Sequence, residues 1–235
     1  MKHMYGRFAQ TRELSRLISR FRFILEDIEV RARYNIAPGQ WVPVLFSAPD
    51  GRRLWPMLWG LVPSWAKNPE IGRGLINARA ETLAEKPAFR TPFKRRRCLI
   101  PSDGFYEWKK TGKSPGQPYF FSLPERQLFA FAGLWDEWNG SDGSIVHSFA
   151  IITTEANDLV RNVHDRMPVI LAQEDEDRWL DPALQTPRDL KPLMQSFPAG
   201  AMRMQPVSTL VNSPANECPE CLRESIPSGQ NDLFD

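Results

Sequence analysis

The chain has 235 residues, 42% of them hydrophobic, which suits one domain, or two small ones, with a core of its own. A formal net charge of only +2 excludes a nucleic-acid binder recognisable by net charge, so any basic surface must be local. No run of 18 apolar residues and no secretion signal are present, and three cysteines fit a reducing compartment, so we expect a cytoplasmic protein that does not enter the membrane.

The first predicted element is an amphipathic helix over residues 11–28. Its apolar residues recur at helical spacing: Leu14, Leu17, Ile18, Phe21, Leu25 and Ile28. The other face carries Arg12, Glu13, Arg16, Arg20 and Arg22. Thr11 is the predicted N-cap, and Ala37-Pro38-Gly39 marks the following turn.

Beyond that turn, short segments rich in β-branched and aromatic residues predict strands over 41–46, 54–62, 98–108, 119–123, 128–138 and 145–154. Short helices are predicted over 155–163 and 174–180. The fold class is therefore α+β, a strand-dominated, strongly curved or barrel-like antiparallel sheet with peripheral helices. We expect one domain over 1–213 and a mobile tail over 214–235, which is rich in Pro, Ser and Asn.

Glu107 is the first candidate for chemistry. Strand alternation puts it on the same face as Phe105, at a sheet edge or in a half-buried cleft. Burial would raise its pKa toward the range useful for general acid–base work. The alternative is an exposed glutamate paired with Lys109 or Lys110.

His164 and the pair Asn77 and Arg79 are further candidates. His164 has an aspartate beside it and could exchange a proton near neutral pH, or it could simply be satisfied by local backbone. Asn77 and Arg79 share one side of an extended segment, and an amide beside a guanidinium suits a phosphate and a polar sugar or base edge. Pairing of Arg79 with Glu81 would instead make the set structural.

Cys218 and Cys221 resemble half a zinc site. Zinc needs four ligands, and the sequence shows no second CxxC or HxxxH partner. We therefore expect neither a metal nor a cofactor.

Eight segments, taken together, resemble the SRAP (SOS response-associated peptidase) family, which is also known for abasic-site processing. They are GRFAQ (6–10), RYNIAPG (33–39), LWGLVPSW (58–65), INARAET (76–82), CLIPSDGFYEWKK (98–110), FAGLWDEW (131–138), FAIITTEAN (149–157) and VHDRMPVIL (163–171). They run in family order and cover most of the chain to about residue 213, so the joint match is highly specific.

The resemblance implies a partner, single-stranded DNA containing abasic sites, and a monomeric protein. In this family a cysteine follows the initiator methionine, and its α-amine and thiol together capture the ring-opened aldehyde of the lesion as a thiazolidine DNA–protein crosslink. The same cysteine is the implied nucleophile in autoproteolysis of that methionine. Nucleoid association is implied when DNA is bound.

The matching positions imply site roles. Asn77 positions the amine and the lesion, Glu107 shuttles protons, and His164 assists opening of the sugar ring. The implied DNA-binding residues are Arg7, Asn35, Trp65, Arg79 and Thr154: arginines that grip phosphates, a tryptophan that stacks on an exposed base, and a threonine that lines the pocket.

The chain departs from the family at the cysteine, where it has Tyr5, preceded by Met1-Lys2-His3. A phenol cannot form a thiazolidine, and a free α-amine would not lie on residue 5. Three explanations stay open: a divergent member that keeps DNA binding, an altered N-terminal sequence, or a Schiff base formed by another amine.

Whether the chain is an enzyme is left open by this change. The family activity is that of a crosslinking lyase or peptidase, that is, a hydrolase. The alternatives are a noncovalent DNA-binding pseudoenzyme, whose DNA affinity is salt-sensitive, and a peptidase acting on other proteins.

Overall fold

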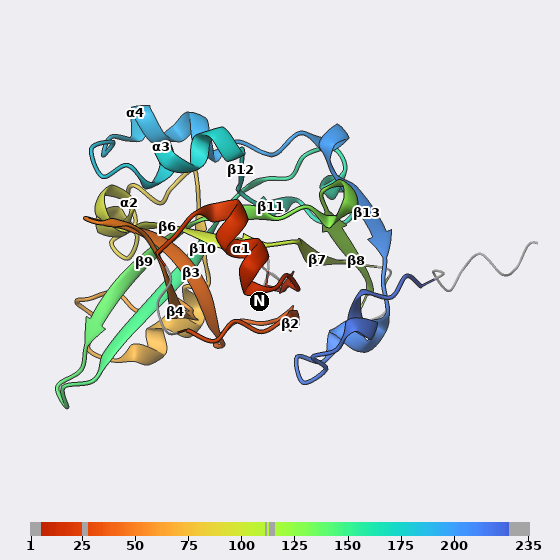
Figure 1. Ribbon diagram of the computed structural model, residues 1–235, viewed down its shortest axis with the longest axis horizontal. Helices are drawn as coiled ribbons and strands as arrows, with labels where there is room; N and C mark the ends of the chain where they lie inside the picture. The colour runs from red at the N-terminus through yellow and green to blue at the C-terminus, as the bar shows by residue number, and fades with distance from the viewer. Residues whose placement is uncertain (1–5, 25–27, 111, 113–115, 226–235) are drawn as a thin grey trace, which may run out of the picture.

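The computed structural model describes residues 6–24, 28–110, 112 and 116–225, and its centre is a closed five-stranded barrel (Figure 1). The barrel strands are β3 (Trp41–Ala48), β4 (Gly51–Trp59), β6 (Arg97–Ser102), β9 (Phe129–Asn139) and β10 (Ile145–Glu155). They pair in the order β10-β4-β3-β6-β9, and β9 pairs back with β10 to close the ring. The predicted strand-dominated, barrel-like fold is therefore confirmed. Two pairings depart from the expected antiparallel pattern, because β4 and the short strand β5 (Asn77–Arg79) both run parallel to β10.

A second sheet lies beside the barrel and carries the N-terminal strand. Its order is β13 (Arg203–Pro206), β8 (Gln117–Ser122), β7 (Gly104–Lys109), β1 (Phe8–Gln10) and β2 (Arg33–Ile36). Three short strands extend the barrel sheet: β5 (Asn77–Arg79) and β11 (Arg166–Pro168) pair with β10, and β12 (Ile170–Leu171) pairs with β9. Figure 1 shows the barrel on the left and the β7–β8–β13 strands on the right.

Helices are few and short, and they lie outside the sheets (Figure 1). The α-helices are α1 (Leu14–Phe21), α2 (Arg90–Arg95), α3 (Glu176–Leu180) and α4 (Pro187–Leu190). Single 3₁₀ turns are Pro69–Gly74, Pro124–Arg126, Val160–Asn162, Gln173–Asp175, Lys191–Met194, Ala199–Ala201, Thr209–Asn212 and Pro219–Leu222. Among the residues that the structure describes, no helix has the length and apolar character needed to cross a bilayer.

Two helix predictions need correction. The helix expected over 11–28 ends at Phe21, because Arg22 adopts a left-handed conformation (φ 49°) that stops it; positions 25–27 lie outside the described residues. Thr11 is not its N-cap: its hydroxyl and backbone N–H donate to the Asp103 carboxylate, and Glu13 occupies the cap position. The helix expected over 155–163 is only the turn at 160–162.

The strand predicted over 98–108 is two strands that belong to different sheets. The chain breaks at Asp103, between β6 of the barrel and β7 of the second sheet. Ser102 secures this crossing, since its hydroxyl donates to the carbonyls of Ala9 and Gly104. The crossing carries Glu107 out of the barrel and into the sheet that contains the N-terminal strand.

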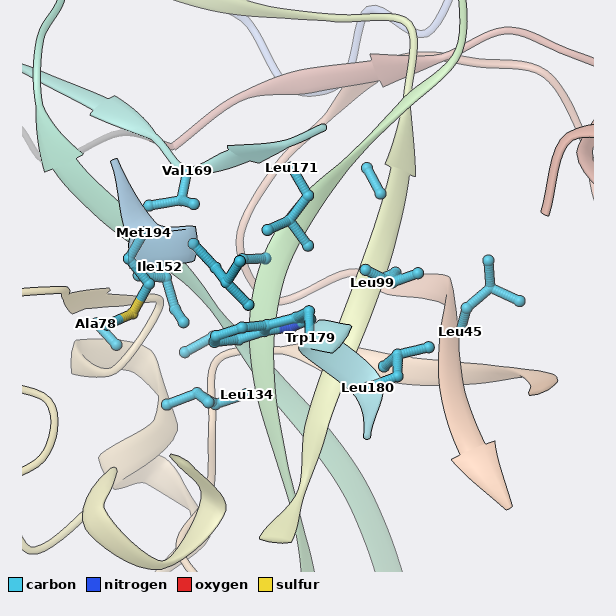
Figure 2. Close-up of a cluster of buried hydrophobic side chains, with 14 of the residues drawn as sticks. Leu45, Ala78, Leu99, Leu134, Ile152, Val169, Leu171, Trp179, Leu180 and Met194 are labelled. Carbon is cyan, nitrogen blue, oxygen red and sulfur yellow. The ribbon is translucent and has the colours of Figure 1, made fainter. Parts of the chain in front are cut away.

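The main core fills the side of the barrel covered by α3. Figure 2 shows Trp179 lying among Leu134, Ile152 and Leu180. The Trp179 side chain is fully buried, and its indole Nε1 donates to the Cys98 carbonyl of β6 at 3.0 Å. This single side chain therefore joins helix and barrel by both apolar packing and a hydrogen bond.

Residues 214–225, expected within the tail, pack against the second sheet. Cys221 is buried in a cluster with Tyr106 and Phe120. The Glu217 carboxylate accepts the Asn35 backbone N–H at 2.9 Å and pairs with Arg33 at 2.8 Å. The packed chain thus continues past the predicted domain end at 213.

We predict that Trp179→Phe lowers the free energy of unfolding by about 2 kcal/mol, because it leaves the buried Cys98 carbonyl without its donor and opens a small void. Trp41→Phe is the matched control, since Trp41 is 52% exposed and should change stability by no more than about 0.5 kcal/mol. Urea unfolding of both variants measures the difference. Equal losses would contradict the structural role given to Trp179.

Candidate functional site

The side chain of Glu107 lies inside the protein near the middle of the second sheet. β7 runs between β1 and β8, and Glu107 faces Tyr119 across the β7–β8 pair. The residue is only 5% exposed, and its Oε1 atom is buried without a hydrogen-bond partner among the described residues. Such an oxygen is costly unless a ligand or a proton satisfies it.

Burial changes the acid–base character of this carboxyl. Desolvation raises the pKa of Glu107 to about 8, the negative charge of Asp165 adds to the rise, and the backbone N–H of Trp108 opposes it. At neutral pH the group is therefore mainly the neutral acid, which can donate a proton. The sequence left two alternatives open, a carboxyl at a sheet edge or in a half-buried cleft and an exposed glutamate paired with Lys109 or Lys110; the structure shows a buried carboxyl on an interior strand, without such a pair among the described residues.

His164 and Asp165 lie on the segment that follows the turn at 160–162. The His164 Nδ1 atom accepts the backbone N–H of Arg166 at 3.0 Å or donates to the Arg166 carbonyl at 3.2 Å, depending on which ring nitrogen carries the proton. Asp165 lies 3.4 Å from that Nδ1 and also acts on the pKa of Glu107. The segment 164–165 and Glu107 therefore belong to one electrostatic environment, although the segment leads into β11 of the barrel sheet and Glu107 lies in the second sheet.

Asn77 and Arg79 are held by β5, which runs parallel to β10 at Ile151 and Thr153. Asn77 is buried, whereas Arg79 is exposed and makes no side-chain hydrogen bond with any other described residue. Ala78 between them packs into the main core. Alternation thus puts Asn77 and Arg79 on the side of β5 opposite to Ala78.

The N-terminal strand reaches this region from the other side of Glu107. β1 pairs antiparallel with β7 at Phe8↔Phe105, and the Tyr106 N–H donates to the Arg7 carbonyl at 3.0 Å. The same register puts Gly6, two residues before Phe8, beside Glu107, two residues after Phe105. Tyr5, the position of the implied nucleophile, lies outside the described residues, as do Met1, Lys2 and His3.

The half-buried Arg7 and the buried Asn35 form one hydrogen-bonded polar unit. The Arg7 guanidinium donates to Asn35 Oδ1 and to the Val211 carbonyl, both at 2.6 Å, and lies 5.5 Å from the centre of the Trp108 ring. The Asn35 amide donates to the carbonyls of Ser213 (2.9 Å) and Asn216 (2.8 Å). Asn35 is fully buried and its side chain holds the Arg7 guanidinium, and its expected role in DNA binding stays a prediction.

Trp65 and Thr154 lie in different surroundings. Trp65 is 59% exposed, which leaves its ring accessible for stacking on a base. Thr154 is buried beside Met167 in the β10–β11 pair. The structure therefore brings the Thr154 strand next to the 164–166 segment and leaves Trp65 on the surface.

Three residues near these positions were missed as individual candidates. Asp165 influences Glu107, and Trp108 stacks with Arg7 while its Nε1 donates to Asn212 at 2.7 Å. Arg166 binds Glu81 through two hydrogen bonds of 2.7 and 3.0 Å. Each lies within a segment that the family match includes, so adjacency to Glu107 and His164 was the available signal.

No metal is indicated within the described ranges. They contain no group of three or more His, Cys, Asp or Glu side chains that could hold an ion. Cys218 and Cys221 are free thiols, and Cys221 is buried against the second sheet.

We predict that Asn35→Ala lowers the free energy of unfolding by about 2–4 kcal/mol, because several buried carbonyls and Arg7 lose their partner. It should also speed tryptic cleavage after Arg223, since the Asn35 amide binds the segment that leads to it. Trp65→Ala is the control and should leave both properties unchanged. Unaltered cleavage in Asn35→Ala would contradict the anchoring role.

Comparisons with known proteins agree with these features. Residues 4–214 match the family model described as SOS response associated peptidase (SRAP). The chain is 43% identical over 221 residues to the abasic site processing protein YoqW of Bacillus subtilis, covering 93% of this chain and 99% of that protein. It is 34% identical over 230 residues to the abasic site processing protein HMCES of Gallus gallus, covering 84% of this chain and 68% of that protein.

Solved structures share the fold. A protein from Bacteroides thetaiotaomicron superposes with a TM-score of 0.83 at 27% identity, covering 94% of this chain and 99% of that one. A phage-related protein from Bordetella bronchiseptica gives a TM-score of 0.68 at 28% identity, covering 87% of this chain and 94% of that one. The chain belongs to the SOS response associated peptidase (SRAP) family.

Proposed function

We propose that this protein binds single-stranded DNA at abasic sites, with Glu107 as the proton donor that acts on the lesion. The observation that carries the proposal is the buried, mainly neutral carboxyl of Glu107 next to the 164–165 segment. It is supported by relatives named abasic site processing proteins.

The chemistry of the lesion suits this group. An abasic sugar interconverts between a closed ring and an open aldehyde, and opening requires a proton at the ring oxygen. A neutral carboxylic acid with a pKa near the working pH is an effective donor for such a step. The imidazole of His164 can bond the sugar oxygen that is released. The Asn77 amide orients the reacting groups.

The DNA strand is held by residues outside this polar interior. Arg79 presents an unpaired guanidinium to phosphate, and Trp65 offers a stacking surface that accepts any base. Arg7 contributes positive charge from a fixed position. These contacts recognise backbone and exposed bases rather than sequence, as a lesion binder requires.

The covalent step depends on residue 5. The family resemblance implies a cysteine there, whose amine and thiol close a five-membered ring on the aldehyde, and this chain has Tyr5 instead. We therefore propose lesion binding without a thiazolidine crosslink. The retained Glu107, His164 and Asn77 leave the scaffold able to support the crosslink once the thiol is restored.

We predict that the protein binds single-stranded DNA carrying one abasic site but gives no adduct on a denaturing gel. A variant with Met1-Lys2-His3 removed and Tyr5→Cys should give a stable adduct, provided that mass spectrometry shows Met4 removed and the cysteine amine free. Adding Glu107→Gln to this variant should slow adduct formation by about 10²-fold or more, because it removes the proton donor.

Three results would contradict the proposal or favour an alternative. An adduct formed by the unaltered chain would show that an amine rather than a thiol captures the aldehyde, and peptide mapping would identify the residue. Equal affinity for intact and abasic DNA would contradict lesion recognition. Cleavage of a peptide without DNA, lost in Glu107→Gln, would favour the peptidase alternative.

The raised pKa of Glu107 also predicts a pH dependence of stability. The folded state keeps this proton up to about pH 8, while the unfolded chain releases it near 4.5, so folding becomes less favourable as pH rises between these values. Glu107→Gln removes this contribution. The variant should therefore gain stability relative to the parent between pH 5 and pH 8 in urea unfolding. A constant difference across that range would show that Glu107 is not protonated in the folded state.

A further inference from the structure

An open groove of about 1000 Å³ lies on a part of the surface that the proposed site does not use. It is formed by α1, the start of β4, the 125–128 turn and the 173–177 turn. Six arginines line it: Arg12, Arg16, Arg20, Arg22, Arg52 and Arg126. They face three acids, Glu125, Glu176 and Asp177. The lining is therefore strongly cationic in a chain whose formal net charge is only +2.

Glu176 organises the floor of the groove. Its side chain is 1% exposed, and it accepts two hydrogen bonds from Arg20, at 2.7 and 3.1 Å. Arg52 lies 3.5 Å from the same carboxylate and 2.7 Å from Asp177. A buried acid that fixes two guanidiniums pre-organises them, so less side-chain entropy is lost when a ligand binds.

The remaining arginines supply the uncompensated charge. Arg126 is paired with Asp103, whereas Arg12 donates to the carbonyls of Glu125 and Arg126, which carry no charge. Arg16 and Arg22 are exposed and form no ion pair with any residue in the described ranges. Three guanidiniums of the groove, those of Arg12, Arg16 and Arg22, thus form no ion pair with any described residue.

Strained backbone converges on the same place. Within the described chain, the non-glycine residues with positive φ are Arg22 (49°), Glu125 (53°) and Arg126 (51°), and all three line the groove. Side chains seldom adopt this conformation unless the surroundings enforce it. Here it turns Arg22 and Arg126 toward the groove from two separate segments.

The lining indicates the chemical class of the ligand. Phe21 is buried and covered by the Arg20 guanidinium at 4.5 Å, so the groove offers no aromatic surface on which a base could stack. Guanidiniums match phosphate oxygens in geometry and charge. The groove is thus suited to phosphate groups and not to bases.

The groove is close to the proposed lesion site but separate from it. Arg126 binds Asp103, and at most about 14 Å of extended chain separates Asp103 from Glu107 along β7. None of the lesion-site candidates lines the groove.

We propose that this arginine-lined groove is a second anion site that binds adjacent phosphate groups, supplied by the backbone of a DNA strand or by a free polyphosphate. The inference does not need the abasic-site function, because it concerns phosphates without a lesion. Failure of the adduct experiment would therefore leave it standing.

The test uses Arg16→Gln with Arg22→Gln, which removes two unpaired charges and leaves the Glu176 pairs intact. The control is Arg90→Gln with Arg188→Gln, two exposed arginines elsewhere that give the same change in net charge. One probe is inorganic tripolyphosphate, measured by calorimetry. The other is a 20-nucleotide single strand without an abasic site, measured by anisotropy at several salt concentrations. Unfolding curves confirm that both variants fold.

We expect the groove variant to bind tripolyphosphate at least 10-fold more weakly than the parent and the control. If DNA occupies the groove, the salt dependence of its binding should also become shallower, by about 1.4 in the log–log slope for two lost contacts. Loss of tripolyphosphate binding alone assigns the groove to a free polyphosphate, and a shallower DNA slope alone assigns it to DNA. Identical behaviour of the groove and control variants with both probes would overturn the inference.

Discussion

The barrel and the candidate site both depend on β10, because its two edges form backbone hydrogen bonds with four other strands. β9 and β4 occupy its first half and close the barrel, and β5 and β11 occupy its second half. An unpaired edge inside the protein would leave polar groups without partners, so each short strand is fixed where it lies. Asn77 on β5 and the segment leading into β11 are thereby brought to one end of the same strand.

The second constraint is the crossing at Asp103, where one continuous sequence leaves the barrel and enters the other sheet. The residues before the crossing close the barrel, and those after it include Glu107 beside the N-terminal strand. A carboxyl group in this position is shielded from water by both sheets, and this shielding keeps it neutral. The same fold that stabilises the molecule therefore also sets the proton affinity of its candidate acid.

Much of the fold could be predicted because its long strands carry their own pattern. β9 and β10 are eleven residues each and rich in β-branched and aromatic residues, whereas β5 has three residues, too few for a pattern to show. The strand over 98–108 could not be divided from sequence, since the break at Asp103 depends on Thr11 and Arg126, which are distant in the chain. Thr11 could not be excluded as a helix cap for the same reason.

The site residues also differ in whether the local sequence could predict their surroundings. Burial of Glu107 was one of two alternatives that its neighbours in sequence left open, but burial of Asn35 gave no sequence signal, because the chain that covers it is the 211–217 segment nearly 180 residues later. The overall composition, with a formal net charge of +2, gave no indication of the arginine-lined groove. The arginines of α1 look like an ordinary solvated helix face until Arg52 and Arg126 join them in space.

The N-terminal strand connects the two regions and explains why they can differ in charge. β1 (Phe8–Gln10) pairs with β7, which carries the neutral acid, and is followed by Thr11, which is bound to Asp103 beside Arg126 of the arginine groove. A neutral proton donor needs surroundings without strong fields, because a nearby guanidinium would stabilise its ionised form and lower its pKa. Phosphate binding instead needs a strong positive field. Keeping the unpaired arginines at the far end of a short rigid strand, with Arg7 held by Asn35 and Val211, lets one small sheet serve both requirements.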